Sequence, residues 1–207
     1  LVLKDLKGGH SGVEIDKGRV NADILAGRVL LGLENFDIIS INGGDKSNAI
    51  PNKCVIRLLV SDVDSFIEKA KESLEVIKNE IFAREKDFSY QINVLSSGNF
   101  SVFEESLKNS LIYLLVSAPN GVLEMSAEIK GLVETSLNLG ILETKETEIF
   151  IDFSLRSNKV SAMKYLEERL KVFSKCIEGS YECFGHYPPW EFKEDSLLQE
   201  IYKECFK

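Results

Sequence analysis

The chain has 207 residues and a formal net charge of −8, with 33 acidic side chains against 25 basic ones. No cluster of Lys and Arg provides the basic face that a nucleic-acid-binding protein needs, and no apolar run approaches the ~20 residues that cross a bilayer. We therefore expect no nucleic-acid partner and no membrane partner. Hydrophobic residues make up 44% of the chain, which is enough for the core of one large domain or two small ones.

The start of the chain and its cysteines indicate where the protein works. The sequence begins with Leu1-Val2-Leu3, without Met and without a signal-peptide pattern, so we expect an internal piece of a longer protein. The cysteines show no CxxC spacing, and they predict reduced thiols in a cytoplasmic protein rather than a disulfide framework. They are Cys54, Cys176, Cys183 and Cys205.

The first part of the chain predicts five elements. A short apolar start is typical of a strand, and the next segment has the apolar spacing of a helix with Asp16 as its N-cap. Two strand-like segments then flank a Gly-rich loop, and an amphipathic helix with a Ser/Asp cap follows. The expected elements are a strand over residues 1–7, a helix over 16–35, strands over 36–43 and 52–60, and a helix over 61–82.

The second part repeats this order of elements, although the two sequences share little identity. The expected elements are a strand over residues 88–95, a helix over 103–117, strands over 132–142 and 148–157, a helix over 160–177 and a last strand over 180–187. Hairpin pairing of the middle strands predicts an antiparallel sheet with helices packed on one face. We thus expect a two-layer α+β fold of two ferredoxin-like βαββαβ halves, 1–82 and 83–179, followed by residues 180–207.

Three polar residues could belong to a functional site, and each also has a plain structural interpretation. His10, in "KGGHSG", is one of only two histidines and is either a turn residue or a chemical group. Asn48, in "INGGDKSNAIPNK", fits an Asx turn in a hairpin loop as well as a ligand contact. Arg156, at the end of a strand, is either a solvated edge residue or a guanidinium that binds a carboxylate in a bidentate manner.

The sequence lacks the motifs of an independent catalyst. It has no HxD or HExxH zinc pattern, no GxSxG elbow and no P-loop. We therefore expect no metal ligands and no activity in this chain by itself.

Five blocks, in order along the chain, resemble the aminoacyl-histidine dipeptidases. These are Xaa-His (carnosine-hydrolysing) enzymes of the zinc aminoacylase/carboxypeptidase superfamily. The blocks are "LKGGHSGVEIDKGRVNA", "SINGGDKSNAIP", "PNGVLEMSAEIKGLVETSLNLG", "SLRS" and "YPPW" with the "DSLL" that follows it.

The resemblance implies a lid domain inserted into a catalytic domain that holds two zinc ions, or another divalent metal, on ligands outside this chain. The partners would be that catalytic domain and a dipeptide substrate, in the cytoplasm, and a homodimer is possible. Residues 180–207 would lead back toward the catalytic domain. The two halves would imitate within one chain the pair of lids that meet in dimeric relatives.

The resemblance also implies roles for particular residues. His10 is similar to the lid histidine that stabilises the oxyanion of the tetrahedral intermediate. Arg156 is similar to the arginine that binds the substrate's C-terminal carboxylate, and Asn48 to an asparagine that holds the substrate. Asn138 in "SLNLG" has a comparable place in the second half. One departure is that the strand after "NAIP" carries its arginine, Arg57, in the middle rather than at its end.

A different class of function is also compatible with the composition. A stand-alone ferredoxin-like binding or dimerisation module would account for the fold, the acidity and the missing catalytic motifs. It would not account for "GGHSG" and "SLRS" occurring together with "YPPW".

Overall fold

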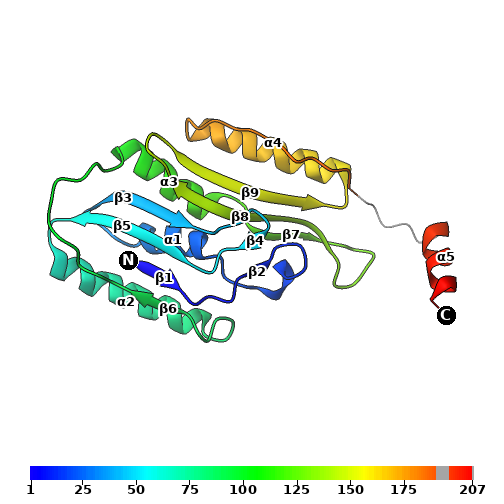
Figure 1. Cartoon of the computed structure of the whole chain (residues 1–207), viewed down its shortest axis with the longest axis horizontal. Helices are drawn as coiled ribbons and strands as arrows, with labels where there is room; N and C mark the ends of the chain where they lie inside the picture. The colour runs from blue at the N-terminus through cyan, green and yellow to red at the C-terminus, as the bar shows by residue number, and fades with distance from the viewer. Residues whose placement is uncertain (190–195, 207) are drawn as a thin grey trace.

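The computed structural model describes residues 1–189 and 196–206. Trp190 of the "YPPW" block and Asp195 of the "DSLL" block lie outside the described residues. Figure 1 shows one layered body with helix α5 (Leu197–Cys205) set apart from it at the C-terminal end. No helix in the described ranges combines the length and the apolar character needed to span a membrane.

The main sheet has seven strands, and all of its pairings are antiparallel. The order β6-β1-β5-β3-β8 runs across the body in Figure 1, and β7 and β9 both pair with β8. The strands are β1 (Val2–Lys4), β3 (Phe36–Gly43), β5 (Cys54–Val60), β6 (Ser89–Gln91), β7 (Gly121–Met125), β8 (Val133–Thr144) and β9 (Ile149–Ser157).

Strand β8 changes partners along its length, and this change shapes the end of the sheet. Its first part, Val133–Leu137, pairs with β7, and its later residues Leu142 and Glu143 pair with β3. The register against β9 shifts between Leu139 and Ile141. The loop after β3 packs against β8 in this interval, because a Cβ on Gly140 would overlap the backbone of Ser47.

The four long helices form the second layer. α1 (Ala22–Leu31) and α3 (Glu105–Ser117) lie behind the sheet in Figure 1, while α2 (Val63–Ile81) and α4 (Val160–Cys176) run along its two sides. The α1 and α3 backbones approach closely at Gly27, where a Cβ would overlap the side chain of Leu115. Tyr113 of α3 stacks on Phe173 of α4 with ring centroids 5.2 Å apart.

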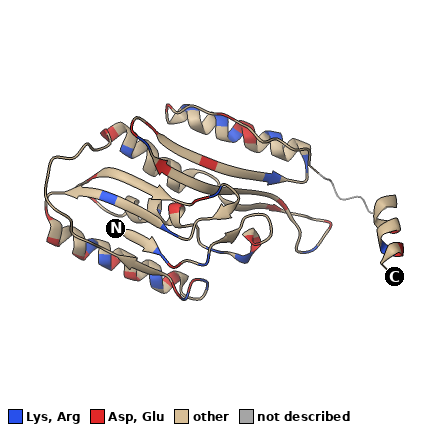
Figure 2. Cartoon of the chain, viewed as in Figure 1, with Lys and Arg blue, Asp and Glu red and all other residues tan. Residues whose placement is uncertain are grey.

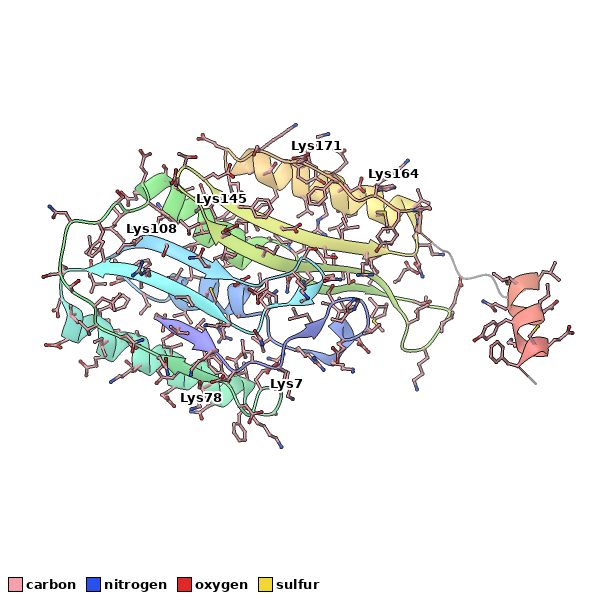
Figure 3. The ribbon with its side chains drawn as sticks, viewed as in Figure 1. Lys7, Lys78, Lys108, Lys145, Lys164 and Lys171 are labelled. Carbon is pink, nitrogen blue, oxygen red and sulfur yellow. The ribbon has the colours of Figure 1, made fainter. Side chains whose placement is uncertain are left out.

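The core lies between the sheet and this helix layer. Alternate strand residues such as Leu3, Ile38 and Ile56 are fully or almost fully buried, and Leu74 and Leu115 cover them from α2 and α3. Charged residues are concentrated on the helices rather than on the strands in Figure 2. Lys108 of α3, marked in Figure 3, donates to the carbonyl of Phe36 on β3 at 3.1 Å and so ties the helix to the sheet.

The α+β class and the mainly antiparallel sheet are confirmed, but several element boundaries are different. The helix expected over 16–35 is a short 3₁₀ turn, Ile15–Lys17, followed by α1. Gly18 takes a left-handed φ of 64° and ends the first turn. The N-cap is Asn21, not Asp16, because the Asn21 side chain accepts from the N–H groups of Asp23 and Ile24.

Two strand predictions differ from the structure. Residues 180–187 form no strand. The strand expected over 88–95 is only Ser89–Gln91, β6, and it pairs antiparallel with β1. The length of a short strand depends on the partner it meets, which the alternation of its own residues does not specify. The division into two repeated halves at residues 82 and 179 stays a prediction.

Candidate functional site

His10 lies on a two-stranded ribbon beside the main sheet. β2 (Gly9–His10) pairs antiparallel with β4 (Ala49–Ile50), and His10 stands opposite Ala49. The N–H of Ser11 extends the ribbon by donating to the carbonyl of Asn48 at 2.9 Å. The structure therefore brings the expected site residues His10 and Asn48 close together, and both are exposed.

The two glycines before His10 are needed for local geometry. Gly8 has a φ of 58° and Gly9 a φ of 135°, in the region that favours glycine. A Cβ on Gly9 would overlap the Arg19 guanidinium and the Glu14 carboxylate. The glycines thus give the chain a tight turn and leave room for an ion pair beneath it.

Glu14 holds the turn that carries His10. Its carboxylate accepts from the His10 N–H at 3.0 Å and pairs with Arg19, which also donates to the Gly8 carbonyl. The hydrogen bonds from the His10 N–H and from Lys17 lower the pKa of Glu14. The sequence gives only one signal for this arrangement, an acid and a base five residues apart just after "KGGHSG".

One buried carboxylate anchors both ends of this segment. Glu85 is almost fully buried and accepts from the N–H of Lys7 at 2.8 Å and from the N–H of Val20 at 3.0 Å. Because Glu85 follows α2 in the sequence, only the folded chain reveals its part in fixing the His10 loop.

The hydrogen bonding of His10 fixes which ring nitrogen carries its proton. Its Nδ1 accepts from the Gly12 N–H at 3.0 Å. A neutral imidazole that accepts at Nδ1 has its hydrogen on Nε2. His10 therefore presents an N–H donor on the side of the ring away from the turn.

Arg156 lies near the end of β9, opposite Ser136 of β8. One terminal nitrogen donates to the Tyr187 hydroxyl at 3.4 Å. Its Nε is buried and has no hydrogen-bond partner within the described residues. Arg156 also belongs to none of the ion pairs found in that part of the chain. Its guanidinium is therefore available to an anion.

His10 and Arg156, which are far apart in the sequence, meet at Gly12. A Cβ on Gly12 would lie 2.8 Å from His10 Cε1 and 3.1 Å from Arg156 Cζ. The two side chains are thus neighbours of the same glycine. Gly12 was not among the candidate residues, because its importance depends on a contact between segments far apart in sequence.

Asn138 has a different place from the other three candidates. Its side chain is 1% exposed, and its amide nitrogen donates to the carbonyls of Ser47 at 3.1 Å and Ala49 at 2.7 Å. Asn21 donates to its oxygen at 3.5 Å and to the Leu139 carbonyl at 2.7 Å. Asn138 therefore fastens the β4 segment to β8 and supports the ribbon that carries His10.

A cavity of about 430 Å³ opens beside Arg156. Gly12, Arg156 and Asn158 line it, together with Ile15, Val133, Glu134, Ser136, Ser157, Tyr187, Pro188 and Pro189. Ser11 Oγ, Arg156 Nε and Asn158 Oδ1 are buried without hydrogen-bond partners in the described residues; Arg156 and Asn158 line the cavity, and Ser11 precedes the lining residue Gly12. Such a group of unsatisfied polar atoms beside a cavity is typical of a binding site for a polar ligand.

The residues of this site do not form a metal centre. Among the described residues, no three or more His, Cys, Asp or Glu side chains are grouped so that they could hold a metal ion. The chemistry available here is hydrogen-bond donation by His10 and anion binding by Arg156.

Comparison with known proteins finds a family match over the first part of the chain. Residues 2–87 match the family described as the peptidase dimerisation domain. This region contains β1, the His10 ribbon, α1, β3, β5 and α2. The matched region thus includes His10 and Asn48 but not Arg156.

Two relatives extend the similarity over the rest of the chain. The cytosol non-specific dipeptidase of Escherichia coli (strain K12) is 33% identical over the whole chain, which covers 44% of that protein. The crystal structure of aminoacylhistidine dipeptidase from Vibrio alginolyticus superposes on this chain with a TM-score of 0.91 and 31% sequence identity. The match covers 99% of this chain and 43% of the Vibrio chain. The chain is therefore homologous to these dipeptidases, and it spans less than half of their length.

Proposed function

We propose that this chain is the lid of a dipeptidase that hydrolyses Xaa-His dipeptides such as carnosine. One observation carries the proposal: His10 and Arg156 converge on Gly12 beside a cavity of about 430 Å³. A donor and a cation held close together suit a short peptide, in which the scissile carbonyl and the C-terminal carboxylate are only one residue apart. The names of the two relatives support the same reaction class.

In this proposal His10 stabilises the oxyanion of the tetrahedral intermediate. The Gly12 N–H fixes the ring and leaves Nε2–H as the donor. A donor aimed at the charge that develops during the reaction stabilises the transition state by about 3 kcal/mol. Glu14 and the two glycines fix the backbone at His10, so little reorganisation is needed when the substrate binds.

Arg156 binds the C-terminal carboxylate of the substrate. Its guanidinium has a fork geometry that matches a carboxylate, and its buried Nε has no partner within the described residues. Asn48, exposed on the same ribbon as His10, contacts the substrate in this proposal, whereas Asn138 acts by holding that ribbon.

The remaining machinery belongs to the part of the relatives that this chain does not span. We propose that a catalytic domain of the same protein holds two zinc ions, and that the lid closes on it in the cytoplasm. The pairing of β3 with β8 would supply within one chain the contact that a dimerisation domain makes between two, and a homodimer of the complete protein is compatible with it.

The test uses the complete protein that contains this chain, with a Xaa-His dipeptide and its C-terminal amide as substrates. Wild type should strongly prefer the free acid, and Arg156→Ala should lose most of that preference with a raised KM. Arg156→Lys should restore it only in part, because an ammonium cannot make the two-pronged contact. Arg57→Ala, which removes an exposed arginine from the middle of β5, is the matched control.

Two results would overturn the proposal. If the complete protein does not hydrolyse Xaa-His dipeptides, the substrate is wrong. If Arg156→Ala discriminates acid from amide as well as wild type does, the carboxylate is bound elsewhere. A chain that forms a stable dimer without any dipeptidase activity would favour the alternative function of a dimerisation module, which the matched family description suggests.

A further inference from the structure

The segment after α4 returns to the candidate site. It runs back along α4 in Figure 1, and His186 Nδ1 lies 3.6 Å from the Glu167 carboxylate of that helix. At the end of this path Tyr187, Pro188 and Pro189 form one side of the cavity beside Arg156. The segment that was expected to lead out of the lid thus also supplies part of the site.

Tyr187 is the residue of this segment that contacts Arg156. Its hydroxyl oxygen accepts from a terminal nitrogen of Arg156 at 3.4 Å. A phenol both accepts and donates, and within the described residues the Tyr187 hydroxyl donates to no protein group. Its O–H is therefore free to donate beside the guanidinium, where a bound anion would lie.

The backbone around Tyr187 favours a fixed position for the phenol. Two prolines follow it directly, and each proline ring fixes φ near −65°. A residue before proline is in turn restricted to extended conformations. The backbone that carries the phenol is thus restricted.

We propose that Tyr187 is a substrate-binding residue that donates a second hydrogen bond to the C-terminal carboxylate held by Arg156. The inference rests on the proposed function and adds to it a donor from outside the two repeated halves. The ring of Tyr187, with the two prolines, forms the wall against the side chain of the C-terminal residue.

Tyr187→Phe in the complete protein tests this role, because it removes the hydroxyl and keeps the ring. KM for the free-acid dipeptide should rise about tenfold, the usual effect of losing one hydrogen bond to a charged group. The kinetics with the C-terminal amide should change little. Tyr187→Ala should raise KM further, because the wall is then lost as well. Tyr165→Phe, at a Tyr that is 67% exposed on α4, is the matched control.

The outcomes separate this inference from the proposed function. If Arg156→Ala abolishes the preference for the free acid while Tyr187→Phe keeps it at the wild-type level, Tyr187 does not bind the carboxylate and the proposed function stands. If wild type itself shows no preference, both fail. An equal loss of activity toward acid and amide in Tyr187→Phe would also overturn the inference, because it would indicate only a structural role.

Discussion

Buried polar atoms without hydrogen-bond partners occur in two regions of the described chain, and the two regions differ in what surrounds those atoms. At the cavity rim they are Arg156 Nε and Asn158 Oδ1, with Ser11 Oγ on the residue before the cavity-lining Gly12; beneath the sheet they are the two carboxylate oxygens of Asp23. The rim atoms lie beside a space that can admit a ligand, whereas Asp23 is fully buried against Gly43. Missing hydrogen-bond partners therefore indicate ligand binding at the cavity rim. At Asp23 they indicate a carboxyl group whose protonation affects the stability of the fold.

The chemistry of the enclosed region follows from burial. Burial raises the pKa of Asp23 to about 7, although the neighbouring Cys54 thiol opposes the shift in part. Burial also raises the pKa of Cys54, and the neighbouring Asp23 carboxylate adds to that increase. Asp23 is therefore protonated in the folded chain over most of the acid range.

The largest effect that we expect is on stability in the enclosed region. Between the ordinary pKa of 3.8 and the folded value of about 7, the unfolded chain ionises Asp23 while the folded chain keeps the proton. The folded state then binds more protons, so the free energy of unfolding falls as the pH rises through this window, by about 4 kcal/mol in total. Urea denaturation of the chain at pH 4 and pH 8 measures most of this change.

Asp23→Asn should remove most of this dependence and be more stable than wild type at pH 8. Asp45→Asn, at an exposed position, should leave the pH profile unchanged. Identical profiles of unfolding free energy against pH for wild type and Asp23→Asn would show that the Asp23 carboxyl does not titrate in this range. The proposed difference between the two regions would then be wrong for the enclosed one.

The next effect concerns the open region. His10→Ala in the complete protein should lower kcat about 100-fold, or about 3 kcal/mol, and change KM much less, because the donor acts mainly in the transition state. Metal content should stay the same. Steady-state kinetics and metal analysis measure both quantities.

His186→Ala is the control for the His10 variant, since it removes the other histidine, which is exposed and pairs with Glu167. A normal kcat for His10→Ala would exclude the oxyanion role. Loss of metal from the His10→Ala protein would indicate that His10 is a metal ligand rather than a hydrogen-bond donor to the oxyanion.

The smallest of these effects tests the hydrogen bonds by which Asn138 of β8 holds the ribbon that carries His10. Asn138→Ala should lower the free energy of unfolding by about 2 kcal/mol, because the Ser47 and Ala49 carbonyls lose their buried donor. It should also reduce kcat, since the ribbon that carries His10 loosens. Asn99→Ala, at an exposed position, should do neither. A raised KM with unchanged stability would instead make Asn138 a direct substrate contact.

Local sequence patterns determined most of the regular structure. The amphipathic spacing of α2 and α4 and the strand patterns of β3, β5, β8 and β9 predicted these elements to within about two residues at nearly every end, because side-chain periodicity is a property of neighbouring residues. The prediction was wrong at the start of α1, where it placed the N-cap at Asp16, four residues before Val20, the first residue of the apolar stripe. Backbone conformation at Gly18 and capping by Asn21 decided the start of the helix.

The candidate residues were identifiable from sequence, but their geometry was not. His10, Asn48 and Arg156 could be named from their motifs, whereas their convergence depends on β8 changing partners from β7 to β3 and on the loop that docks beside it. Asn138 was named as a ligand contact, and only its burial indicated a supporting role. Gly12 lies in the "KGGHSG" block and Tyr187 in the "YPPW" block, but neither block assigned them a role in the site. They join the site through contacts between distant segments, which the tertiary structure alone decides because no local pattern records which segments will meet.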